Sequence, residues 1–185
     1  MVVVVPAHDE EQTLAETIAS LDTQTRRPDQ VLVVSDNSTD TTVEMARRAG
    51  ARVTETVANT AKKAGARNQA LAALLPTLSP DDFILIQDAD SALDPQFIES
   101  ALRHLQNDPM LGAVGGVFRG QPGGGFVGHL QRNEFARYAR DVRRLGGKCL
   151  VVTGTAAVFR VSTLRAVSEA RLRGVLPAGD GAGGV

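Results

Sequence analysis

Four consecutive valines open the chain at positions 2–5, and a run so apolar and so short indicates a strand that is buried on both faces. Three further predicted strands follow, at 31–34, 51–57 and 83–86, and a segment with helical spacing separates each from the next. Strands that alternate with helices in this way pair in parallel, because each helix carries the chain back across the sheet. The sequence therefore predicts a Rossmann-like α/β domain with a mostly parallel central sheet and helices on both faces.

The predicted helices have identifiable starts. Asp9 and Gln12 have the spacing of a capping box ahead of a first helix. Further helices are predicted over 43–50, over 62–75 and from Asp94-Pro95 onward, where an N-cap residue precedes a first-turn proline. Beyond Gly112 the chain is rich in glycine. There we predict strands over 113–119, 149–152 and 156–160, a polar arginine-rich helix over 127–144, and a short last helix capped by Ser162.

Polar side chains follow three of the apolar strands, at the point where each strand ends. His8, Asp9 and Glu10 follow the first, Asp36 follows the second, and Asp88 with Asp90 follows the fourth. The carboxyl ends of parallel strands meet at one edge of the sheet, and ligands of open α/β sheets bind at that edge. The sequence thus predicts one polar site built from three distant stretches.

Asp88 and Asp90 are the sharpest local signal, because two carboxylates at i and i+2 after a buried strand can face one small volume. Carboxylate oxygens suit Mg²⁺ or Mn²⁺, which keep open positions for phosphate oxygens. The alternative is a pair of solvated turn aspartates. Asp36 has two interpretations as well: a carboxylate that binds a nucleotide, or an N-cap of the next helix.

Lys62 and Lys63 stand at a predicted helix start, where a cation and the helix N-terminus could face phosphate. Composition alone favours the alternative, an ordinary pair of surface lysines. His8 is interpreted as a pocket-wall residue. The single cysteine, Cys149, is interpreted as a small buried apolar residue rather than a nucleophile.

Composition and missing motifs exclude several classes of protein. The 185 residues fit one domain, and 20 basic against 21 acidic residues give a net charge of −1, which argues against nucleic-acid binding through bulk positive charge. No apolar run reaches the length of a membrane span. The chain has no Walker-type phosphate loop, no Gly-x-Gly-x-x-Gly after the first strand and no Gly-x-Ser-x-Gly elbow.

Five short segments, in order, resemble the motifs of family 2 glycosyltransferases with the GT-A fold, in the cellulose, hyaluronan and chitin synthase-like branch. They are residues 4–11 (VVPAHDEE), 36–40 (DNSTD), 63–68 (KAGARN), 88–90 (DAD) and 153–160 (TGTAAVFR). Each segment is weak evidence by itself, but the ordered set spans the chain from Val2 to about Arg160.

The resemblance implies a role for each matching residue. Pro6, Ala7, His8 and Glu10 would form the wall around the base, and Asp36 would hold uracil. Lys63 would lie near the base or the diphosphate. Asp88 would contact the ribose or donor sugar, and together with Asp90 it would form the site for Mg²⁺ or Mn²⁺. Gly154 and Thr155 would border the donor sugar and acceptor. The implied reaction is inverting, metal-dependent transfer from a nucleotide sugar, usually a UDP-sugar, to a saccharide or lipid-linked acceptor.

The sequence departs from the family pattern at its end. The family's acidic pair, with the Asp that deprotonates the acceptor, has no counterpart here, and neither has Gln-x-x-Arg-Trp. We therefore expect the catalytic base to lie beyond Val185, and the chain alone to transfer no sugar. The implied organisation is one GT-A domain over 1–185, with a nucleotide-sugar-binding half at 1–111 and a partial acceptor-side half at 112–185.

The expected location is the cytoplasm or the cytoplasmic face of a membrane, with membrane contact only through segments that these residues do not contain. No nucleic-acid partner is expected. The alternative function is a truncated or degenerate module that binds nucleotide sugars without turnover. A sugar nucleotidyltransferase is disfavoured, because it needs a basic, glycine-rich loop where this chain has Pro6-Ala7-His8-Asp9.

Overall fold

A computed structural model describes residues 1–117, 137–144, 146–147 and 154–176. The strands are β1 (Val2–Ala7), β2 (Gln30–Ser35), β3 (Arg52–Glu55), β4 (Phe83–Gln87), β5 (Ala113–Gly115) and β6 (Ala156–Arg160). The helices are α1 (Leu14–Asp22), α2 (Thr42–Arg48), α3 (Lys62–Leu74), α4 (Phe97–Asn107) and α6 (Val161–Leu172), with a 3₁₀ turn at Leu75–Thr77. Residues 137–144 are also helical.

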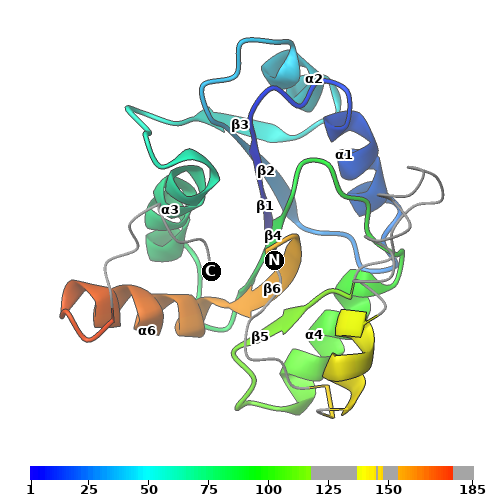
Figure 1. Ribbon diagram of the computed structural model, residues 1–185, viewed down its shortest axis with the longest axis vertical. Helices are drawn as coiled ribbons and strands as arrows, with labels where there is room; N and C mark the ends of the chain where they lie inside the picture. The colour runs from blue at the N-terminus through cyan, green and yellow to red at the C-terminus, as the bar shows by residue number, and fades with distance from the viewer. Residues whose placement is uncertain (118–136, 145, 148–153, 177–185) are drawn as a thin grey trace.

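The six strands form one sheet in the order β3-β2-β1-β4-β6-β5 (Figure 1). Strands β1, β2, β3 and β4 run parallel, whereas β6 is antiparallel to both β4 and β5. The prediction of a mostly parallel α/β sheet is confirmed. The chain leaves β1 toward β2 on one side and later returns to β4 on the other, so the strand order reverses between β1 and β4. Ligand crevices form at such a switch point.

Strand β1 separates from β4 before it separates from β2. Its pairing with β4 ends at Val4, opposite Ile86, but its pairing with β2 continues to Ala7, opposite Ser35. The strand extends beyond the valine run at 2–5, and Pro6 lies inside β1 beyond the last β4 pair. Proline has no N–H to donate to a neighbouring strand, which suits a position where one neighbour is absent. The divergence opens the sheet edge between β1 and β4.

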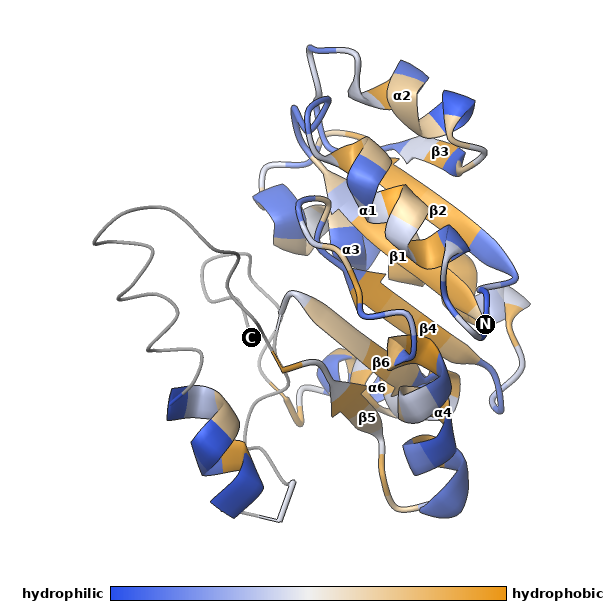
Figure 2. Ribbon diagram, turned by 90° about the vertical axis from the view of Figure 1, so that its right-hand side faces the viewer, coloured by the Kyte–Doolittle hydropathy of each residue, from blue (hydrophilic) through white to orange (hydrophobic). Residues whose placement is uncertain are grey.

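Two apolar clusters cover the two faces of the sheet (Figures 1 and 2). On one face, Val3, Val5 and Leu85 pack with α1, α2 and α4. On the other face, Val4 and Ile84 pack with α3 and α6. Successive residues of a strand point to opposite faces, so the valine run supplies both clusters at once. Helices on both faces, as predicted, bury the strands and hold their carboxyl ends in place.

Three predicted helix starts are wrong in detail. Helix α1 begins at Leu14, and Thr13 rather than Asp9 occupies its N-cap position. Helix α4 begins at Phe97, two residues beyond Pro95, while the Asp94 carbonyl accepts from the Phe97 N–H. The last helix begins at Val161, which puts Ser162 in its first turn.

Of the other predicted elements, the strand at 113–119 is described only as β5, and the helix at 127–144 only from residue 137. The strand predicted at 149–152, with Cys149, lies outside the described residues.

Candidate functional site

A cavity of about 500 Å³ lies at the carboxyl ends of β1, β2 and β4. It is therefore at the edge where the sequence placed its polar residues, beside the reversal of strand order. Its lining residues come from the ends of these three strands and from the segment before and at the start of α3: Pro6, Ala7, His8, Glu10, Asp36, Asn37, Asn59, Thr60, Lys62, Lys63, Asp88, Ala89 and Asp90.

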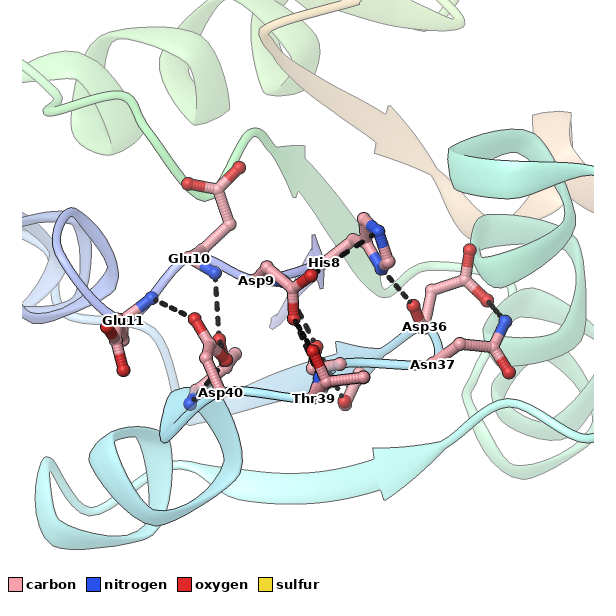
Figure 3. Close-up of polar contacts among 11 residues, drawn as sticks. His8, Asp9, Glu10, Glu11, Asp36, Asn37, Thr39 and Asp40 are labelled. Atoms are coloured by element: carbon pink, nitrogen blue, oxygen red, sulfur yellow. Dashed lines mark hydrogen bonds and ion pairs between the residues drawn. The ribbon is translucent and has the colours of Figure 1, made fainter.

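Asp36 is the most heavily hydrogen-bonded residue of the cavity, and it is only 7% exposed. One oxygen, Oδ1, accepts from Asn59 Nδ2 at 2.7 Å, from Thr56 Oγ1 at 2.8 Å and from Asn37 Nδ2 at 3.0 Å. In Figure 3 the other oxygen, Oδ2, points away from the Asn37 amide. Helix α2 begins only at Thr42, so Asp36 does not cap it. The cap interpretation of Asp36 is therefore wrong, and its binding to a nucleotide stays a prediction.

His8 is fixed against the same residue. Its Nδ1 lies 2.6 Å from the Asp36 carbonyl oxygen, and the Asp36 N–H donates to the Ala7 carbonyl at 2.8 Å. A carbonyl only accepts, so His8 carries a proton on Nδ1. The other ring nitrogen, Nε2, lies 3.7 Å from an Asp9 carboxylate oxygen. The ends of β1 and β2 are therefore joined at the cavity wall.

The loops that follow β1 and β2 bind each other through several hydrogen bonds (Figure 3). Asp9 adopts a left-handed conformation, with φ of 53°, and its carboxylate accepts from the Thr39 N–H at 2.7 Å. In return, Asp40 accepts from the Glu11 N–H at 3.1 Å and from the Thr42 N–H at 2.9 Å. Aspartate tolerates this backbone region better than most residues. The contacts fix the loop that carries His8 and Glu10.

Asp40 titrates unusually because of this arrangement. Desolvation acts to raise its pKa, but hydrogen bonds from the Thr42 hydroxyl and from the backbone N–H groups of Thr42 and Glu11 act in the opposite direction and prevail. The pKa of the Asp40 carboxyl is therefore lower than usual, and the ionised form is favoured in the folded protein.

Lys63, from α3, forms an ion pair with Asp88 at the end of β4. Asp88 Oδ1 is buried, and apart from this ion pair it has no hydrogen-bond partner among the described residues. The Asp88 N–H donates to the Thr155 carbonyl at 2.8 Å, which joins the end of β4 to the start of β6. Asp90 is exposed, and its carboxylate accepts from the Ser91 hydroxyl at 3.3 Å. One carboxylate is thus tied to a cation, and the other is open to solvent.

Polar residues on the buried side of α1 hold the loop that contains Asp90. Thr17 donates to the Ala89 carbonyl at 2.7 Å, and Ser20 accepts from the Leu93 N–H at 3.2 Å. Gln24 donates to the Asp94 carbonyl at 2.8 Å and accepts from the Ile98 N–H at 3.1 Å. These buried side chains satisfy backbone groups of an irregular segment, which would otherwise be costly to bury.

The cavity brings together eight of the ten residues that the sequence assigned to the site: Pro6, Ala7, His8, Glu10, Asp36, Lys63, Asp88 and Asp90. Gly154 and Thr155 are not part of its lining as the described residues define it, although the Thr155 carbonyl contacts Asp88. Sequence reasoning missed Asn59 and Thr60. The sequence marks Asn59 only by its residue type and by its place in a turn, six residues ahead of Gly65 and near the start of a helix.

The charge balance of the cavity is acidic. Four carboxylates, those of Glu10, Asp36, Asp88 and Asp90, face two lysines among its described lining residues. No group of three or more His, Cys, Asp or Glu side chains within the described ranges is arranged to hold a metal ion. The site therefore offers one or two carboxylates to a cation, the number with which Mg²⁺ is usually bound when phosphate oxygens complete its coordination.

The family model for glycosyl transferase family 2 matches residues 2–168 of this chain. That match covers most of the chain, including every described residue of the cavity, and the chain belongs to this family. The resemblance predicted from five short motifs is confirmed.

Among curated proteins, the chain is similar to the poly-β-1,6-N-acetyl-D-glucosamine synthase of Staphylococcus aureus, with 22% identity over 163 residues. The aligned part is 85% of this chain and 38% of the synthase. The chain thus spans less than half the length of this relative.

Two solved structures have the same fold. A mannosyltransferase from Pyrobaculum calidifontis, in complex with GDP-Man and Mn²⁺, matches with a TM-score of 0.66 and 23% identity, over 90% of this chain and 46% of that one. Glucosyl-3-phosphoglycerate synthase from Mycobacterium tuberculosis, in complex with Mn²⁺, UDP and glucosyl-3-phosphoglycerate, matches with a TM-score of 0.58 and 26% identity, over 86% of this chain and 56% of that one. The predicted GT-A fold is confirmed by these likenesses.

Within the part of the chain that the structure describes, no helix has both the length and the apolar character needed to cross a membrane.

Proposed function

We propose that this chain binds the donor of an inverting, metal-dependent glycosyl transfer, and that the donor is a UDP-sugar. The observation that carries the proposal is that Asp36, Lys63, Asp88 and Asp90, from two strand ends and a helix start, line one cavity at the switch point of the sheet. Its volume of about 500 Å³ lies within the range of small-molecule sites.

Asp36 supports uracil as the base. Its Oδ1 is occupied by three donors, so the remaining acceptor toward a ligand is Oδ2. A carboxylate can accept from a ring N–H but cannot donate to a ring nitrogen. Uracil presents an N–H at N3, whereas cytosine presents an acceptor there. Pro6, Ala7 and His8 would form the wall beside the base.

The acidic balance of the cavity supports the metal. A nucleoside diphosphate is an anion, and four carboxylates against two lysines would repel it. Asp88 and Asp90 would hold Mg²⁺ or Mn²⁺ together with the diphosphate oxygens, as their oxygen ligands allow. When bound, such an ion stabilises the negative charge that grows on the diphosphate as the sugar leaves.

Lys63 would bind the diphosphate in addition to the metal ion. Its side chain is 45% exposed and its ammonium group pairs with Asp88, so it can turn toward an incoming phosphate without leaving a fully buried site. Arrival of a divalent cation at Asp88 would release Lys63 from this pair. The lysine would then donate to a diphosphate oxygen and orient the leaving group.

The sugar and acceptor sides are proposed on the resemblance. Gly154 and Thr155 would border the donor sugar, residues 1–111 would form the donor-binding half, and 112–185 part of the acceptor half. The acceptor would be a saccharide or a lipid-linked sugar, with the chain in the cytoplasm or at the cytoplasmic face of a membrane. Donor binding without turnover is the second candidate, and the cavity residues named above support donor binding in either case.

Calorimetric titration with UDP, with Mn²⁺ and with a chelator, tests the proposal. We expect binding in both conditions and at least about tenfold tighter binding with Mn²⁺, since the ion offsets the carboxylates. Asp90→Asn should remove most of the Mn²⁺ effect, whereas the control Asp81→Asn, in an exposed turn before β4, should retain it. No UDP binding in either condition would refute donor binding, and equal affinity in both would refute the metal role.

A further inference from the structure

The turn between β3 and α3 is organised by one side chain, that of Asn59. Its Nδ2 donates to Asp36 Oδ1 at 2.7 Å and to the Lys62 carbonyl at 2.8 Å. Its Oδ1 accepts from the Ala61 N–H at 3.0 Å. A single amide thus joins the carboxylate at the end of β2 to the backbone that starts α3.

The backbone on both sides of Asn59 is in a conformation that it would not adopt without support. Ala58 and Lys62 both have left-handed backbone angles, with φ of 48° and 49°. Neither is a glycine, an asparagine or an aspartate, the residues that visit this region most readily. Such conformations persist where surrounding contacts fix them, and the bonds of Asn59 to Ala61 and Lys62 provide those contacts.

Gly65 provides the space that the Asn59 side chain occupies. A Cβ atom at position 65 would lie 1.8 Å from Asn59 Oδ1 and 2.7 Å from Asn59 Cγ. Both distances are shorter than any tolerable non-bonded contact, so a side chain at 65 would displace the amide. The next neighbour, Ala61 Cβ at 3.1 Å, is close but requires a shift of only a few tenths of an ångström.

We propose that Asn59, held against Gly65, is the positioning residue of the nucleotide site: it fixes Asp36 with Oδ1 occupied and Oδ2 directed to the base. Asn59 contacts no reacting atom in this role. It acts on the base through Asp36. Its hydrogen bond to the Lys62 carbonyl also fixes the backbone from which the Lys63 side chain extends. The base end and the diphosphate end of the cavity therefore share one support. The inference rests on the proposed function, because it assigns Asp36 to the base.

Four proteins test the inference: wild type, Asn59→Ala, Gly65→Ala and the double variant. We expect Asn59→Ala to weaken UDP binding by up to about tenfold, because a poorly positioned Asp36 loses most of its charged hydrogen bond to the base. The preference for UDP over CDP should also fall, because the Asp36 carboxylate keeps only two of its three donors and is held less firmly. Gly65→Ala should have the same two effects while Asn59 is present.

The double variant separates the proposed mechanism from general damage. Alanine at 59 removes both atoms that would collide with a Cβ at 65, so Gly65→Ala should then change the UDP dissociation constant less than about twofold. In that background the Tm should stay constant or rise, since alanine favours a helix more than glycine does. In the wild-type background the same change should lower the Tm.

Gln69→Ala is the matched control. Gln69 holds the same turn through two hydrogen bonds to the Val57 backbone, both 2.9 Å long, and it makes no recorded contact with Asp36. We expect it to lower the Tm and leave UDP affinity and the preference over CDP unchanged.

A purely structural role would be shown if Asn59→Ala behaved as Gln69→Ala, with a lower Tm and unchanged binding, and this would overturn the inference. Equal effects of Gly65→Ala with and without Asn59 would overturn it as well. If wild type bound no nucleoside diphosphate, the proposed function and the nucleotide part of the inference would both be refuted. The Tm measurements on the ligand-free proteins would still decide whether Gly65 acts through Asn59.

Discussion

Replacing Asp36 with asparagine changes the hydrogen-bonding character of one cavity atom while keeping the shape of the side chain. The asparagine Oδ1 can still accept from Asn59, Thr56 and Asn37, the three donors that hold the native carboxylate. The atom that replaces Oδ2 becomes an NH₂ group, which donates and cannot accept. The group that is proposed to face N3 of the base therefore changes from an acceptor to a donor.

The magnitude follows from the bonds gained and lost. UDP loses one hydrogen bond to a charged acceptor, worth about 1.5–3 kcal/mol, and its affinity should fall about 10–150-fold. CDP gains a neutral hydrogen bond from the new NH₂ group to its N3, worth about 0.5–1.5 kcal/mol. The ratio of UDP to CDP affinity should therefore fall by a factor of at least about 30.

Stability provides the control for this substitution. Asp36→Asn should cost less than about 1 kcal/mol of unfolding free energy, because the three donors keep an acceptor. Asp36→Ala should cost about 2 kcal/mol, because the acceptor is lost. Calorimetry with both nucleotides and urea unfolding of both variants measure these quantities. An Asp36→Asn protein that binds UDP as wild type does, and still rejects CDP, would refute the assignment of Asp36 to the base.

Three further changes test the framework around the site. Gln24→Leu should lower the unfolding free energy by about 2 kcal/mol in urea titrations, because the buried Ile98 N–H loses its acceptor; an unchanged value would show that this N–H finds another partner. Leu105→Ala, at a fully buried position of α4, should cost about 2–5 kcal/mol in the same assay, and a cost below about 1 kcal/mol would contradict the packing described. The lowered pKa of Asp40 means that its contribution to stability is present above about pH 4 and is lost as the pH falls through the folded-state pKa. The acid-induced loss of Tm should therefore be smaller in Asp40→Asn than in wild type.

The fold was predictable because its central strands, β1 and β4, are buried on both faces. Val2 to Val5 and Phe83 to Ile86 have no polar residue, so their length and apolar character identified them without reference to neighbours. Asp36 and Asp88 each follow a parallel strand, so the sequence placed both residues at one edge of the sheet. Eight predicted site residues accordingly line one cavity.

What sequence reasoning missed depends on contacts between distant segments. Asp9 had the spacing of a capping residue, but Thr39, 30 positions away, offers its N–H and holds Asp9 outside the helix. Asn59 carried no periodic signal, since its value comes from Asp36 and from the absence of a side chain at Gly65. Tertiary hydrogen bonds of this kind override local capping preferences, and no local sequence pattern predicts them.

The central claim is that the edge of β1, β2 and β4 binds the donor nucleotide, and backbone amide NMR tests it directly. Titration of the 19.5 kDa chain with UDP and Mg²⁺, which is not paramagnetic, reports every amide whose surroundings change. We expect the largest shifts at His8, Asp36, Asn59, Lys63 and Asp90, with little change in the groove between β3 and α3 near Arg52 and Ala73. Shifts concentrated in that groove, or no shifts at millimolar UDP, would contradict it.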